Sequence, residues 1–178
     1  MMLKIIRFNI IKFLVIILAL GLLIAERGVI PVQNATDKDW NKQSFWYSPW
    51  GKSGVHKGID IFAKKGTHVL SSTTGLVIFT GNISMGGNVV AVLGPKWHIH
   101  YYAHLAKINS KTFSWVPCGE VIGAVGDTGN ALGKPPHLHY SVVSLIPYPW
   151  RFSIETQGWK KMFFMNPINN FSLRGYPR

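Results

Sequence analysis

The fold class follows from residues 75–105, which read GLVIFTGNISMGGNVVAVLGPKWHIHYYAHL. Three runs rich in β-branched and aromatic residues alternate there with glycine-containing turns such as Gly86-Gly87: 75–82, 88–93 and 98–104. Four further runs have the same character: 59–62, 69–71, 121–125 and 138–143. This spacing is typical of antiparallel all-β domains, and no long helical period occurs between Ser44 and Val143. We therefore expect an all-β fold, a compact antiparallel sheet domain.

The length of the chain predicts one domain with additional segments. Its 178 residues, 47% of them hydrophobic, are enough for one domain with a core and too few for two. Residues 28–43 are polar and turn-rich, and we expect them to form a linker into a domain over residues 44–145. Residues 146–178 are aromatic and basic, and Pro147, Pro149 and Pro167 argue against a continuous helix. We expect this extension to pack on the domain.

Residues 1–27 have the layout of an export signal or a membrane anchor. Lys4, Arg7 and Lys12 precede an uninterrupted apolar run, Phe13–Ala25, which is the order typical of a secretory signal. As a helix the run is roughly 20 Å long, shorter than the ~30 Å hydrocarbon core, and snorkelling by Lys12 lengthens it. Both interpretations of this segment, a cleaved signal peptide and a retained membrane anchor, are compatible with the sequence. Basic residues ahead of the run predict that the rest lies outside the cytoplasm, in the periplasm or cell envelope.

Charge and cysteine content narrow the classes of partner and site. The chain has 19 Lys and Arg against seven Asp and Glu, a formal charge of +12, which favours an anionic wall polymer or membrane surface. Nucleic acid is not expected, because the basic residues are dispersed along the chain. The single cysteine, Cys118, excludes an intramolecular disulfide framework and cysteine-rich zinc sites.

Two histidine segments suggest a metal hydrolase. They are His56-Lys57-Gly58-Ile59-Asp60 and His137-Leu138-His139, and histidine with carboxylate is a ligand set that zinc accepts in catalytic sites. On a strand, His137 and His139 leave the same face because they are two residues apart. By the same alternation His98, His100, Tyr102 and His104 share one face. If the two strands are antiparallel neighbours, several imidazoles meet over one groove.

The glutamates restrict how such a site can move a proton. Only Glu26, Glu120 and Glu155 occur, none of them in a histidine motif, and there is no His-Glu-x-x-His. A histidine must therefore handle the proton, which neutral imidazole does well near pH 7. The site needs three ligands and at least one spare histidine. We expect His98 and His100 to be groove or surface residues.

The order of several motifs resembles the lysostaphin-type (LytM-like) zinc endopeptidases. The motifs run from about Ser48 to Val142: His56-Lys57-Gly58-Ile59-Asp60, Gly86-Gly87-Asn88, Tyr102-Ala103-His104-Leu105, Gly126-Asp127-Thr128-Gly129 and His137-Leu138-His139-Tyr140. This resemblance implies an antiparallel β fold with an open groove, one zinc ion per chain, and hydrolysis of peptide cross-links in bacterial peptidoglycan. A second type of LytM-like module is not catalytic: it binds and activates another wall hydrolase.

The resemblance also implies roles for five residues. Carried over by position, His56, Asp60 and His139 are the zinc ligands, and His104 and His137 are unligated catalytic residues. One of the two histidines accepts the proton of the attacking water, which zinc makes more acidic. The other stabilises the tetrahedral oxyanion or protonates the leaving amine. The sequence does not assign these two tasks between them.

Overall fold

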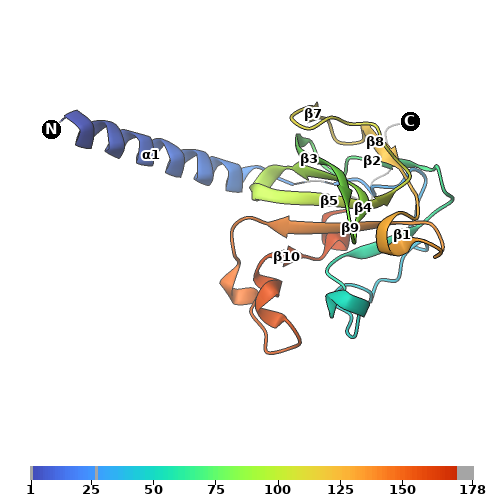
Figure 1. Ribbon diagram of the computed structural model, residues 1–178. Coiled ribbons are helices and arrows are strands. Elements are labelled where there is room, and N and C mark those ends of the chain that lie inside the picture. The colour runs from blue at the N-terminus through green and yellow to red at the C-terminus, as the bar shows by residue number, and fades with distance from the viewer. Residues whose placement is uncertain (1, 27, 172–178) are drawn as a thin grey trace.

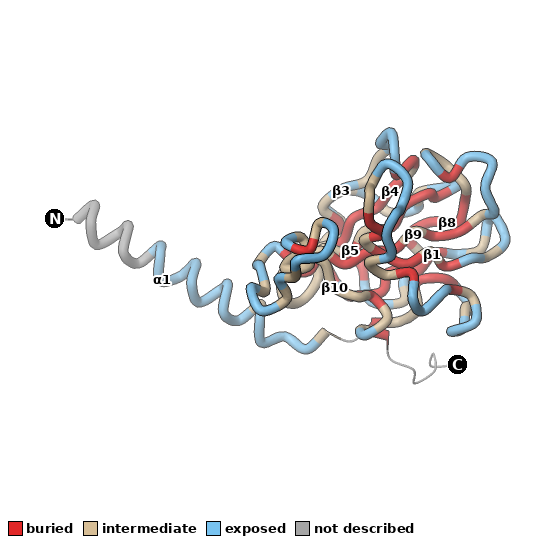
Figure 2. The backbone as a smooth tube through the Cα atoms, turned by 90° about the horizontal axis from the view of Figure 1, so that it is seen from below, coloured by how far each residue is buried: buried red, intermediate tan, exposed pale blue. Residues whose placement is uncertain are grey.

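The computed structural model describes residues 2–26 and 28–171, with side chains from residue 10 onward. Helix α1 (Met2–Leu23) projects from a β domain that contains the rest of the described chain (Figure 1). Most residues from Ile10 to the end of the helix are exposed (Figure 2). In the described part of the chain, no helix combines the length and apolar character needed to cross a membrane.

The strands form two antiparallel sheets in the described residues. The larger sheet has seven strands in the order β1-β9-β5-β4-β3-β7, and β10 also pairs with β9. Its strands are β1 (Ile59–Phe62), β3 (Gly75–Ile83), β4 (Gly87–Leu93), β5 (His98–Leu105), β7 (Trp115–Val116), β9 (His137–Ser144) and β10 (Phe164–Met165). The smaller sheet has the order β2-β8-β6, with strands β2 (His68–Leu70), β8 (Val121–Ala124) and β6 (Lys107–Ile108).

The all-β, antiparallel prediction is confirmed. The seven predicted strands overlap β1, β2, β3, β4, β5, β8 and β9. The strands β6, β7 and β10 were not predicted, because each has two residues and a pair of residues carries no readable alternation. Each of these short strands pairs with a longer neighbour, so the pairing defines them rather than their own sequence.

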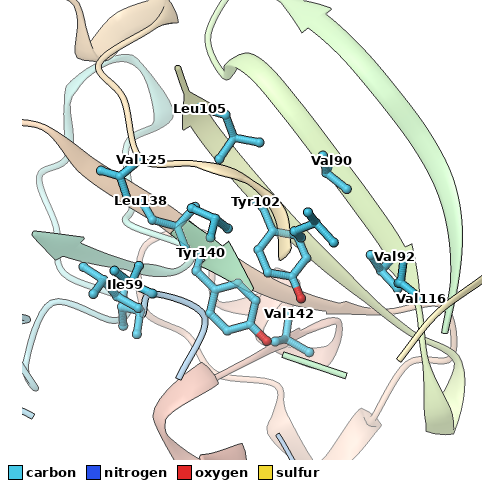
Figure 3. Packing of buried hydrophobic residues seen from close by; sticks show 14 of the residues in the cluster. Ile59, Val90, Val92, Tyr102, Leu105, Val116, Val125, Leu138, Tyr140 and Val142 are labelled. Atoms are coloured by element: carbon cyan, nitrogen blue, oxygen red, sulfur yellow. The ribbon is translucent and has the colours of Figure 1, made fainter. Parts of the chain in front are cut away.

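One hydrophobic core contains residues from both sheets (Figure 3). Strand β9 alternates, as a half-buried strand should: Leu138, Tyr140 and Val142 are fully buried in the core, whereas the intervening residues line a groove on the other face. The Tyr140 ring lies 5.1 Å from the Tyr102 ring of β5, centroid to centroid. The alternation therefore places the functional histidines of β9 on the face opposite the core.

The segment 28–43 packs into the domain, in contrast to the linker that we expected. Val32 is fully buried and forms a bridge with Val69 of β2. Trp40 is also buried, and its ring meets that of Phe171 edge-on at 5.6 Å. The segment has no periodic pattern because it joins the sheets through isolated bridges. Residues up to Phe171 of the C-terminal extension pack on the domain through β10 and three short 3-10 helices, Pro149–Arg151 (η4), Gly158–Met162 (η5) and Pro167–Asn170 (η6).

The buried carboxylate of Glu26 holds the chain segment after α1 against the core-facing side of β5. The Glu26 side chain is 3% exposed, and its two oxygens lie 2.7 Å from Nδ1 of His98 and 2.8 Å from Nε2 of His100. On its other side, Nδ1 of His100 accepts a 2.7 Å hydrogen bond from the Tyr140 hydroxyl. The prediction that His98 and His100 are groove or surface residues is wrong, because both are buried with Glu26 on the core side of the sheet.

This cluster predicts a loss of stability in acid. Burial raises the pKa of Glu26, but the hydrogen bonds from His100 and His98 outweigh it and lower the pKa from 4.5 to about 2. A lowered folded-state pKa stabilises the fold fully above the unfolded pKa. The contribution is therefore lost as the pH falls from about 4.5 to about 2. We expect Glu26→Gln to lower the free energy of unfolding at pH 7 by about 3 kcal/mol, since it removes hydrogen bonds to a charged group.

Urea unfolding of the full chain across this pH range measures the effect. The matched control is Glu155→Gln, because Glu155 is also paired with a cation, Lys161, but its side chain is 60% exposed. Exposed pairs contribute about 0–1 kcal/mol. Equal losses in the two variants would contradict the assignment of Glu26 as a stabilising buried charge.

Candidate metal centre and catalytic groove

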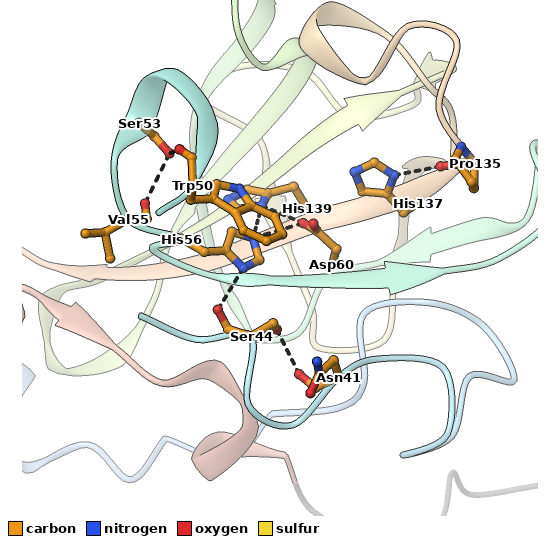
Figure 4. A network of polar contacts seen from close by, with 10 residues as sticks. All are labelled: Asn41, Ser44, Trp50, Ser53, Val55, His56, Asp60, Pro135, His137 and His139. Carbon is orange, nitrogen blue, oxygen red and sulfur yellow. Dashed lines mark hydrogen bonds and ion pairs between the residues drawn. The ribbon is translucent and has the colours of Figure 1, made fainter. Parts of the chain in front are cut away.

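Three side chains from separate segments meet at one point on the groove face of the large sheet (Figure 4). Asp60 of β1 and His139 of β9 are directly paired in the antiparallel register, and Nδ1 of His139 lies 2.8 Å from Oδ1 of Asp60. His56, in the loop before β1, places its Nε2 atom 3.1 Å from each of these two atoms. The structure thus brings together all three residues predicted as metal ligands.

Glycine at position 58 permits the close approach of the His56 loop to β9. A Cβ atom on Gly58 would lie 2.5 Å from the Tyr140 carbonyl oxygen and 3.0 Å from two atoms of the His139 ring. Real Cβ atoms do not come so close to backbone, so any larger residue would push the loop away from the strand. The glycine in this motif therefore sets the distance between His56 and His139.

The donor set and its surroundings fit a zinc ion. Tetrahedral zinc with N and O ligands separates its ligand atoms by roughly 3.4 Å, close to the 2.8–3.1 Å separations found here. The Nδ1–H group of His56 donates a 3.0 Å hydrogen bond to the Ser44 carbonyl, which leaves Nε2 with a free lone pair, as is usual for a metal-binding imidazole. Burial raises the pKa of Asp60, but the adjacent His139 and His56 rings outweigh this effect and hold the pKa well below its usual range.

Two further histidines lie beside this cluster, each held by a backbone carbonyl. Nδ1–H of His104 donates to the Thr128 carbonyl at 2.9 Å, and Nδ1–H of His137 donates to the Pro135 carbonyl at 2.8 Å. Their rings are 5.1 Å apart, and the His104 ring is 6.0 Å from that of His139. Both anchored rings keep Nε2 as the atom free to exchange a proton in the groove that they line.

The His104 side chain faces the groove because a backbone irregularity at this residue turns it to the opposite face of the sheet. Its φ of +64° is uncommon for a residue other than glycine, and the β4–β5 register shifts close by, between Asn88 and Val90. The prediction that His104 shares a face with His98 and His100 is therefore wrong. Strict alternation would have placed His104 on the core side, away from His139.

The position of His104 also affects its protonation. Burial lowers its pKa, and the neighbouring His139 and His137 lower it further, to about 4, despite the opposing effects of the Thr128 carbonyl and Asp60. His104 is consequently neutral at pH 7. A neutral imidazole with Nδ1–H fixed by a carbonyl can accept a proton at Nε2.

These residues line an open groove of about 780 Å³. Its floor comes from alternate residues of β5 and β9, from Ile99 and Val143 at one end to the histidines at the other. Trp50 stacks on His56 with ring centroids 4.1 Å apart, and Phe62 lies 5.4 Å from the His137 ring. Sequence reasoning did not find either aromatic residue. Phe62 could have been found, since it is two residues after Asp60 on β1, whereas Trp50 lies in a loop without a pattern.

Comparison with known proteins agrees with this geometry. Residues 54–146, more than half of the chain, match the family described as Peptidase family M23. The chain is 36% identical over 128 residues to the L-Ala–D-Glu endopeptidase of Bacillus subtilis (strain 168), covering 62% of this chain and 39% of the relative. It is 38% identical over 88 residues to the peptidoglycan DD-endopeptidase ShyA of Vibrio cholerae, covering 49% and 20%.

A solved structure is similar as well. The catalytic domain of the antimicrobial peptidase lysostaphin from Staphylococcus simulans superposes with a TM-score of 0.58 at 28% identity, covering 71% of this chain and 86% of that domain. The chain spans less than half the length of the two curated relatives above. The family match covers every residue from His56 to His139, and with it the whole candidate site. The chain belongs to peptidase family M23.

Proposed function

We propose that this chain is an exported zinc metalloendopeptidase that hydrolyses peptide cross-links of bacterial peptidoglycan. The observation that carries the proposal is the convergence of His56, Asp60 and His139 within 3.1 Å, beside two anchored histidines, in an open groove. The family match and relatives that are named as endopeptidases, one of them a peptidoglycan endopeptidase, support the same reaction and substrate.

In this proposal the five residues divide into two groups. His56, Asp60 and His139 would hold the zinc ion, which when bound acts as a Lewis acid on the scissile carbonyl and makes water more acidic. His104 and His137 present Nε2 to the groove. One of them accepts a proton from the attacking water, and the other donates a hydrogen bond to the developing oxyanion or a proton to the departing amine nitrogen.

The N-terminal segment supports export in the same proposal. Lys4, Arg7 and Lys12 precede the apolar run, and most apolar side chains of α1 from Ile10 onward are exposed. We propose that the β domain lies on the outer side of the cytoplasmic membrane, in the periplasm or cell envelope. Protease added to intact spheroplasts should then digest the domain, and protection until the cells are lysed would argue against export.

Purified cell walls test the peptidase directly. We expect the full chain to release soluble peptides from peptidoglycan sacculi, and we expect a chelator to stop the release and added zinc to restore it. Mass spectrometry of the released fragments identifies the bond that is cut. Bound zinc without peptide release would favour the alternative, a non-catalytic LytM-like module that activates another wall hydrolase. Absence of zinc from the purified protein at neutral pH would contradict the metal centre itself.

A further inference from the structure

The segment that begins directly after β9 and runs into the C-terminal extension exposes an unusual number of large apolar side chains. Five of them occur within fifteen residues: Leu145, Trp150, Phe152, Ile154 and Trp159. Trp150 is 78% exposed and Ile154 is 98% exposed. Scattered exposed apolar residues are ordinary, but a concentration of this kind marks an interaction surface. We call residues 145–159 with these side chains the apolar collar.

The apolar collar begins near α1 and lies at the end of the domain from which the helix projects. Figure 1 shows η4 and η5 at the same end of the domain as α1, with β9 between them and the helix. Trp97 connects the two: its indole Nε1–H donates a 2.9 Å hydrogen bond to the Leu18 carbonyl of α1, and its own carbonyl accepts a 3.0 Å hydrogen bond from the Leu145 amide. Trp97 therefore links the first residue of the collar to the helix.

From Phe13 onward, helix α1 is apolar on every side. Eleven of its large apolar side chains, and Ile24 just after it, are exposed: Ile10, Ile11, Phe13, Leu14, Val15, Ile16, Ile17, Leu18, Leu20, Leu22, Leu23 and Ile24. A helix that is hydrophobic all round is stable in an apolar environment rather than in water. The same environment is then available to the collar, which lies at the same end of the domain.

Basic side chains accompany the aromatic rings of the collar. The Lys160 ammonium lies 5.5 Å from the centroid of the Trp159 ring. Arg151 follows Trp150, and Glu155, the one acidic residue of the collar, is neutralised by Lys161. Aromatic rings interspersed with lysine and arginine are the composition of surfaces that lie in the interface of a bilayer containing anionic lipid.

We propose that the apolar collar docks on the surface of an anionic lipid bilayer, beside an α1 whose apolar side chains enter the lipid. A fully exposed Ile154 and an exposed Leu145 favour lipid over a glycan strand, because sugar rings stack on flat aromatic faces and gain little from branched aliphatic chains. The positive charge around the rings favours an anionic headgroup. This surface is separate from the groove, and its docking involves no hydrolysis.

Docking at this place would orient the groove. Leu145 follows directly on Ser144, the last residue of β9, and β5 begins at His98 on the same end of the sheet. Leu145 lies six positions after His139, which is roughly 20 Å at the rise of a β-strand. The groove floor would thus lead away from the lipid, with the metal centre held at that distance.

Spin labels in the full chain test the docking. In a Cys118→Ser background, single labels are placed at Ile154→Cys and Phe152→Cys, and at Phe113→Cys as the matched control. Phe113 is 79% exposed, in the loop before β7. The protein is reconstituted in vesicles of phosphatidylcholine and phosphatidylglycerol. We expect the ratio of oxygen accessibility to that of a water-soluble nickel complex to be several-fold higher at 152 and 154 than at 113.

Each alternative gives a different result. Equal ratios at 154 and 113 would overturn the proposal. Shielding of position 154 from both reagents with spin–spin broadening would overturn it in favour of a second copy of the chain. Shielding that appears only on addition of soluble glycan fragments would overturn it in favour of the wall polymer. Omission of phosphatidylglycerol is expected to lower the ratio at 154, and an unchanged ratio would overturn the assignment of anionic lipid.

Discussion

His139→Ala is expected to remove zinc and peptidase activity together. His139 contributes one of three atoms that lie within 3.1 Å of one another, so its loss leaves His56 and Asp60 as a two-residue site. Loss of a residue that merely supports a ligand costs about 10- to 100-fold in metal affinity or activity, and loss of a ligand should cost more. We expect His56→Ala and Asp60→Ala to behave in the same way. Metal analysis of the purified variants, together with peptide release from sacculi, measures both effects.

The control for these variants is another histidine of the same domain. His68 is exposed on β2, on the smaller sheet and outside the groove, so His68→Ala should keep both zinc and activity. Zinc retained in His139→Ala at the content of His68→Ala would contradict the proposed ligand set.

His104→Ala and His137→Ala are expected to keep zinc and to lose turnover. Neither side chain belongs to the three-atom cluster, but each presents an anchored ring to the groove. Loss of a general acid or base lowers the rate by about 10²–10⁴-fold. The loss should appear in kcat, since the binding surface of the groove remains. Steady-state kinetics on a synthetic cross-linked peptide, with metal content measured on the same samples, separates these variants from those of the ligands.

Two outcomes would change this assignment. A His104→Ala variant without zinc would place His104 among the ligands rather than among the proton-transfer groups. Full activity in either variant would show that the other histidine handles the proton alone. Unfolding midpoints equal to that of the unchanged protein would show that the kinetic effects do not come from loss of the fold.

Short-range rules predicted the part of the site that regular strands build. His137 and His139 are two residues apart on β9 and face the same side, as alternation requires. Asp60 lies opposite His139 because β1 pairs with β9, and glycine 58 allows His56 to approach. These relations depend on the spacing of residues within a motif and on the pairing of two strands. Both can be predicted from the sequence.

The rest depended on contacts between distant segments. Alternation predicted the wrong side for His104, because its positive φ is held by hydrogen bonds to Gly86 and Thr128, which no pattern within β5 reports. The same rule placed His98 and His100 at the groove, whereas their partner is Glu26, more than seventy residues earlier. Sequence periodicity contains no information on such long-range pairing of polar side chains.

The central place of β9 in the large sheet has a consequence for how the domain opens. This strand pairs with β5 along one edge and with β1 and β10 along the other, and Leu138, Tyr140 and Val142 are fully buried. Amide hydrogens in such a strand exchange with solvent only when the whole cooperative unit unfolds. Loops and the collar can open locally at a small free-energy cost, while the strand that bears His137 and His139 stays closed. We therefore expect the amides of His137 and His139 to be among the slowest to exchange.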